Sequence, residues 1–158
     1  MSIEDERPSP RAFRYWVQHA DFSTDDGSAV DRVSASAAFT RHDWDAELSA
    51  ARRLVASGVA VCPPTMCFVP AGDAGDVELH VRPLDWSTAA LQYGFRSPRS
   101  HWLGFIPRAP IQEDRTVTSV PIDEVRAAID LFVGSRHAEL LAFLSRFAPA
   151  PGQGPDAR

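Results

Sequence analysis

Apolar and polar residues alternate in several segments of the chain, which predicts β-strands because successive side chains of a strand point to opposite faces. The clearest segment is 77–84, where Val77, Leu79 and Val81 alternate with charged residues and a histidine. Residues 12–22 alternate in a similar way and predict an earlier strand. Shorter strands are expected at 94–95, 102–106 and, along an edge of the sheet, 116–120.

Two hairpins are predicted in the first half of the chain. Residues 23–28 favour a turn and would connect the first strand to a second at 29–39, although alanine and serine leave a helix open for that segment. The apolar runs 59–62 and 67–70 flank a proline-rich link of four residues. This arrangement favours a second hairpin, or one strand bent at the prolines.

Apolar residues recur at helical spacing in three other segments. Residues 41–57 predict a helix with one buried stripe, with acids near its start and arginines near its end. Residues 121–133 and 136–147 predict two further helices in the C-terminal third. Asp85 is expected to cap a short helix that continues to Leu91.

The order of these elements predicts an α+β fold, in which a mainly antiparallel sheet is covered by helices. We expect about five to seven strands, covered by one central helix and two C-terminal helices. A chain of 158 residues fits one domain, which we place at 11–148. The proline-containing ends, 1–10 and 149–158, are expected to be flexible arms.

The composition is that of a globular protein, with 44% hydrophobic residues and a net charge of −5. Because the arginines are dispersed among a majority of acids, nucleic acid is not expected as a partner. The apolar runs are far shorter than the roughly 20 residues of a membrane helix, and the acidic N-terminus does not resemble a secretory signal. We therefore expect a cytoplasmic protein that does not bind membranes.

Lysine is absent, so arginine and histidine are the only basic side chains. The absence of lysine excludes Schiff-base catalysis and a phosphate-binding loop that depends on lysine. Any bound anion would be held by guanidinium groups, backbone N–H groups or histidine. The common cofactor motifs are also missing, and no cofactor is expected.

One candidate site is the polar segment between Gly94 and Trp102. Its guanidinium and hydroxyl groups are suited to binding phosphate or carboxylate, and His101 could act as an acid or base near neutral pH. The candidate ligand-binding residues of this segment are Arg96, Ser97, Arg99, Ser100 and Trp102. The alternative is a solvated surface loop whose arginines pair with acids.

A second candidate site lies on the polar face of the strand predicted at 77–84. Glu78, His80 and Arg82 occur at every second position and project from one side of the sheet. If another element covered that face, Glu78 and His80 could act as catalytic residues and Arg82 could bind a ligand. If the face is open to water, the row is a set of solvated charges.

No metal site is expected from the spacing of cysteine and histidine. Cys62 and Cys67 fit neither a redox pair nor one of two zinc pairs, and they are interpreted as reduced structural thiols. His19, His42 and His137 lie on different predicted elements, without the spacing of a helical metal site.

Two functions remain open. The first is a non-enzymatic binding protein, of the immunity or accessory type, that docks a protein partner through an acidic, aromatic-bearing surface containing Asp43 and Asp45. The second is a small enzyme or ligand-binding domain whose arginine and histidine side chains bind an anionic or aromatic molecule. Either could be a monomer or a homodimer.

Overall fold

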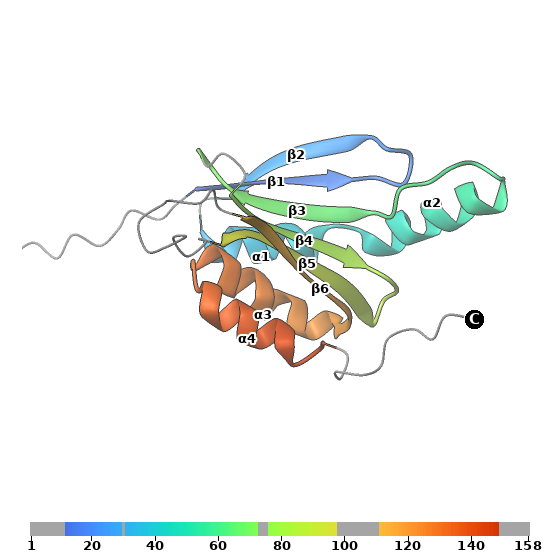
Figure 1. Ribbon diagram of the computed structural model, residues 1–158. Coiled ribbons are helices and arrows are strands. Elements are labelled where there is room, and N and C mark those ends of the chain that lie inside the picture. Colours follow the sequence, from blue (N-terminus) through green and yellow to red (C-terminus); the bar gives the residue numbers. More distant parts are fainter. Residues whose placement is uncertain (1–11, 30, 73–75, 98–110, 149–158) are drawn as a thin grey trace, which may run out of the picture.

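The structure is a computed structural model that describes residues 12–29, 31–72, 76–97 and 111–148. Within them, six antiparallel strands form one sheet with the order β2-β1-β3-β4-β5-β6 (Figure 1). The strands are β1 (Phe13–Gln18), β2 (Thr24–Ala29), β3 (Thr65–Pro70), β4 (Val77–Pro83), β5 (Thr88–Ser97) and β6 (Ile111–Pro121). The helices are α1 (Arg32–Arg41), α2 (Trp44–Ala56), α3 (Ile122–Val133) and α4 (His137–Ser145). The predicted α+β class is confirmed.

The core lies between the sheet and three helices. α1, α3 and α4 cover one face of the sheet (Figure 1). Phe68, Leu79 and Leu91 point toward these helices and are fully buried, and Ile129 and Leu140 meet them from α3 and α4. Burial of a side chain of this size contributes about 1.5–3 kcal/mol. The described helices leave the opposite face of the sheet uncovered, and we call it the open face.

The hairpin predicted at the start of the chain is confirmed, but its second strand lies earlier in the sequence than predicted. β2 occupies 24–29, most of which was predicted as the turn, and it pairs with β1 along its length. Most of the segment 29–39 belongs to α1, so the helix that the sequence left open for this segment is the correct alternative. Asp31 starts α1 with a capping box: its carboxylate accepts the backbone N–H of Ser34 at 2.7 Å.

Two further predictions of local structure are wrong. Residues 59–64 connect α2 to β3 without regular structure, so 59–62 and 67–70 form neither a hairpin nor one strand bent at the prolines. β3 instead pairs with β1 and β4. Asp85 caps a turn and not a helix, because Oδ1 accepts the backbone N–H groups of Ser87 and Thr88, each at 2.7 Å. β5 begins directly after this turn.

The other predicted elements are found close to their expected positions. The helices predicted at 41–57, 121–133 and 136–147 are α2, α3 and α4, and the edge strand is β6. The strand expected at 102–106 and the arms at 1–10 and 149–158 lie outside the described residues. No helix in the described part of the chain is long and apolar enough to span a membrane.

Candidate functional site

Helix α2 differs from the other helices in that none of its residues is buried. Asp43 caps its first turn by accepting the backbone N–H of Ala46 at 3.0 Å. The predicted stripe of apolar residues is present, but Trp44 and Leu48 are only half-buried and Val55 is 59% exposed. Figure 1 shows why: α2 extends beyond the end of the sheet. The prediction that this stripe is buried is therefore wrong.

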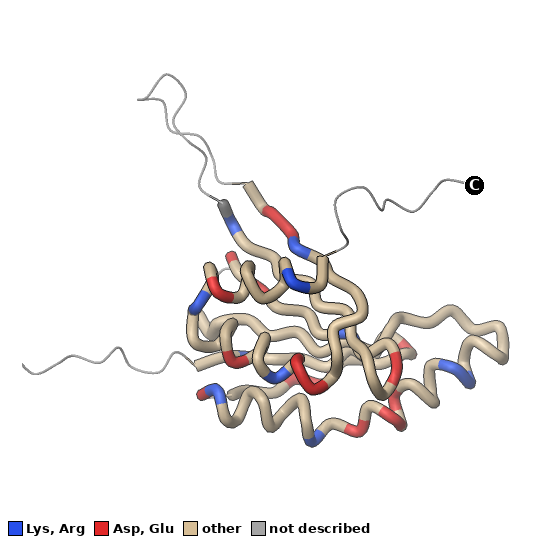
Figure 2. Tube along the Cα trace, turned by 90° about the horizontal axis from the view of Figure 1, so that it is seen from below, with Lys and Arg blue, Asp and Glu red and all other residues tan. Residues whose placement is uncertain are grey.

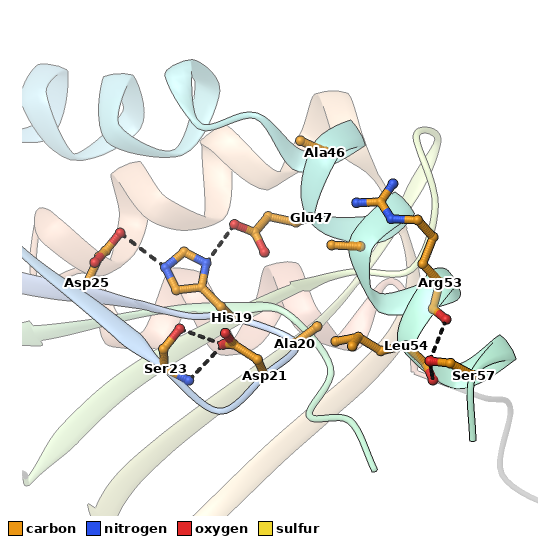
Figure 3. A pocket seen from close by; sticks show the side chains of 11 residues that line it. His19, Ala20, Asp21, Ser23, Asp25, Ala46, Glu47, Arg53, Leu54 and Ser57 are labelled. Atoms are coloured by element: carbon orange, nitrogen blue, oxygen red, sulfur yellow. Dashed lines mark hydrogen bonds and ion pairs between the residues drawn. The ribbon is translucent and has the colours of Figure 1, made fainter. Parts of the chain in front are cut away.

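On one side, α2 faces the turn between β1 and β2 across a hollow of about 730 Å³, which we call the His19 hollow. On the α2 side, the charged Glu47 and Arg53 stand among small and apolar side chains, and mainly polar residues of the hairpin form the other wall (Figure 3). The residues that line it are His19, Ala20, Asp21, Ser23, Asp25, Ala46, Glu47, Ala50, Arg53, Leu54 and Ser57.

His19 joins the two walls of this hollow. Its Nδ1 lies 2.7 Å from Oε1 of Glu47, and its Nε2 lies 3.1 Å from Oδ2 of Asp25 (Figure 3). The same Glu47 oxygen lies 3.2 Å from Nε2 of His42. Both ring nitrogens of His19 can donate only when the imidazole is protonated. Burial lowers the pKa of His19, but the hydrogen bonds and negative charges of Glu47 and Asp25 outweigh it and raise this pKa above its ordinary value.

On its other side, α2 borders a second hollow of about 270 Å³, which we call the Trp86 hollow. Trp86 lies in the turn between β4 and β5 and is 76% exposed. Hydrogen bonds from Ser87 and Thr88 fix this turn through Asp85 and lower the pKa of its carboxyl to about 2. Asp85 therefore stays charged throughout the neutral range. The residues that line the hollow are His42, Asp43, Trp44, Asp45, Leu48, Pro83, Asp85, Trp86 and Ile122.

Acidic groups dominate both hollows. Among the described lining residues, the Trp86 hollow has three aspartates and no arginine, and the His19 hollow has three acids and one arginine. Figure 2 shows several acidic positions near the start of α2. We call α2 together with the two hollows the α2 surface. Its charge and its exposed tryptophan are suited to binding a cationic group, through carboxylates and through the face of the indole ring.

The predicted row on β4 lies on the open face. Oε1 of Glu78 and Nε2 of His80 are 3.3 Å apart, so the structure brings these two residues together. Arg82 lies beside His80 at a hollow of about 100 Å³, and no described residue forms a hydrogen bond with its buried Nε. No described helix covers this row, so the described residues do not supply the helical cover that would favour the acid/base hypothesis.

The candidate segment between Gly94 and Trp102 is described only in its first part. Nε of Arg96 lies 2.9 Å from Oδ1 of Asp76, so this guanidinium is paired with an acid, as the alternative interpretation expected. Ser97 ends β5. The remaining candidates, Arg99, Ser100, His101 and Trp102, lie outside the described residues.

Sequence reasoning did not anticipate the partner of His80 on the neighbouring strand. Cys67 of β3 lies opposite His80, with its Sγ 3.4 Å from Nε2. Burial and the negative charge of Glu78 raise the pKa of the Cys67 thiol well above its usual range. Cys62 and Cys67 are both free in the structure.

No protein-family model matches the chain, and searches of curated proteins and of solved structures found no match.

Proposed function

We propose that this protein is a non-enzymatic docking protein whose α2 surface binds a basic segment of a protein partner. The observation that carries the proposal is the exposure of α2, an amphipathic helix with no buried residue. A helix of 13 residues is marginally stable by itself and depends on packing of its apolar face. A partner laid along α2 would supply that packing.

The chemistry of the α2 surface selects a basic partner. An arginine placed over Trp86 would contact the indole face and could pair with Asp45 or Asp85 at the same time. Tryptophan is enriched among the residues that dominate binding energy, whereas charges at a rim mainly accelerate association. Trp86 would therefore provide most of the affinity, and the surrounding acids would raise the association rate and favour basic partners.

We further propose that docking takes place in the cytoplasm. Cys62 and Cys67 are free, and Cys67 contacts a histidine and not the other cysteine. Free thiols are typical of proteins in reducing compartments.

The test is a pull-down that compares the proteins captured by the wild-type protein with those captured by two variants of it. Trp86→Ala removes the aromatic contact, and Asp43→Asn with Asp45→Asn removes two charges while asparagine preserves the cap of α2. We expect a basic protein on the wild-type bait, at least about tenfold weaker binding to Trp86→Ala, and slower, less salt-sensitive association with the double variant.

The matched control for the double variant is Glu113→Gln with Asp114→Asn, which changes the net charge equally but on β6. This control should bind the partner as the wild type does. If all baits retain the same proteins with equal affinity, the α2 surface is not the docking site.

A second candidate function, binding of a small anion, is favoured by the buried Nε of Arg82 beside the 100 Å³ hollow. This volume is well below the roughly 300 Å³ of the smallest typical ligand pockets, so a compact anion is the expected class. A native mass spectrum of the gently purified protein tests it. An additional stoichiometric mass that disappears in Arg82→Gln supports the anion site, and a mass that persists in this variant contradicts it.

A further inference from the structure

We propose that Cys67, Glu78 and His80 form a binding site for a divalent metal ion of the zinc type on the open face. The site is separate from the α2 surface and does not depend on the docking function. It also departs from the sequence-based prediction that the chain binds no metal.

The three potential ligand atoms converge in space. Sγ of Cys67, a carboxylate oxygen of Glu78 and a ring nitrogen of His80 all lie within 4.8 Å of one another. Nε2 of His80 is 3.4 Å from the sulfur and 3.3 Å from Oε1 of Glu78. For a tetrahedral zinc site with ordinary bond lengths, these two separations would be about 3.6 Å and 3.4 Å. These two separations already match a tetrahedral site closely. The third, between Sγ and the carboxylate oxygen, is within 4.8 Å, and rotation of the partly exposed Glu78 side chain can shorten it.

The sheet positions these ligands rigidly. Glu78 and His80 lie two residues apart on β4 and share a face, and the register of β3 and β4 places Cys67 directly opposite His80. The next residue in this row across the sheet is Trp16 on β1, whose ring contacts the His80 ring edge-on with centroids 6.5 Å apart. Ligands on neighbouring strands are held more precisely than ligands on loops.

One of the three ligands is buried and the other two are partly exposed, so the site is held by the protein and is still open to an ion from solvent. Cys67 is 1% exposed and forms the floor. The side chains of His80 and Glu78 are 29% and 35% exposed, so an ion can reach them from solvent. The fourth ligand of a tetrahedral ion would be water, which can reach the ion past the partly exposed side chains of Glu78 and His80.

The donor set indicates the class of metal. One thiolate, one imidazole and one carboxylate suit zinc, whereas magnesium and calcium prefer oxygen ligands alone. Binding requires the Cys67 thiol to transfer its proton to solvent and the imidazole to be neutral. The thiolate and the carboxylate then balance the two positive charges of the ion.

Cobalt titration of the untagged, reduced, full-length protein tests the proposal. The protein is first treated with a chelator, which is then removed, and Co²⁺ is added as the spectroscopic probe. We expect one equivalent to bind with a thiolate-to-cobalt charge-transfer band and the visible bands of a tetrahedral ion, and Zn²⁺ to displace it. The absence of a charge-transfer band at saturating Co²⁺ would overturn the proposal.

Variants assign the ligands. Cys67→Ser should abolish the charge-transfer band, and the matched control Cys62→Ser should leave it unchanged. The opposite pattern would contradict the site. If Cys67→Ser does not fold, Glu78→Gln provides the decisive variant, because its side chain is partly exposed and the change conserves its shape. We expect Glu78→Gln to weaken Co²⁺ binding by about tenfold or more and Glu113→Gln to leave it unchanged; equal affinity in the two variants would overturn the assignment.

Discussion

His19 is a residue at which pH should change the stability of this protein near neutrality. Its ring bridges Glu47 of α2 and Asp25 of β2, and its pKa is raised in the folded state. A raised pKa means that the folded protein binds a proton more tightly than the unfolded chain does. The resulting stabilisation is complete below the ordinary histidine pKa and is lost as the pH rises through the raised value.

Denaturant unfolding from about pH 5.5 to about pH 8.5 checks this expectation, since the range spans the titration of histidine. The free energy of unfolding of the wild type should exceed that of His19→Gln at the acidic end, and the difference should shrink toward the alkaline end. His42 shares Glu47, so His42→Gln serves as a control for the second imidazole. A difference that grows with pH would contradict the raised pKa of His19.

At the residue scale, the sequence predicts those contacts whose geometry follows from local spacing. The pairing of Glu78 with His80 follows from the period of two along a strand. The contact of His19 with Glu47 could not be found this way, because 28 residues separate them and only the docking of α2 beside the hairpin joins them. The contact of Cys67 with His80 likewise required the register of β3 and β4, which no local pattern specifies.

At the scale of elements, the amphipathic helices were the most predictable. α3 and α4 bury the apolar stripes that their spacing indicates. β2 was missed because Thr24–Ala29 consists mainly of polar and small residues, which locally favour a turn. Pairing with β1 imposes the strand conformation there, so tertiary context overrides local preference. The α2 helix was predicted correctly, but the stripe alone could not reveal that the described residues cover it only in part.

Because α2 is exposed, replacing a leucine of α2 by alanine should destabilise the protein less than the same replacement in a buried helix. Leu140 on α4 is fully buried, so Leu140→Ala should lower the free energy of unfolding by about 2–5 kcal/mol. Leu54 on α2 is only half-buried, so Leu54→Ala should lower the free energy of unfolding by much less. Denaturant unfolding of the two variants provides the comparison, and native-state hydrogen exchange should show α2 opening at lower free energy than α3. Equal costs for the two leucines would mean that α2 is packed in solution, for example by a second copy of the chain.

At the scale of the whole molecule, every described core residue lies between Phe13 and Phe147. We therefore predict that a chain trimmed to 12–148 folds as a single domain, in agreement with the boundaries expected from the sequence. Its melting temperature should match that of the full chain within about 3 °C, which corresponds to roughly 1 kcal/mol for a domain of this size. Trimming keeps all the apolar contacts that the described core residues make with one another, and burial of apolar surface supplies most of the stability. Differential scanning calorimetry of both chains makes the comparison, and a larger drop or the loss of a single cooperative transition would show that the terminal segments belong to the folded unit.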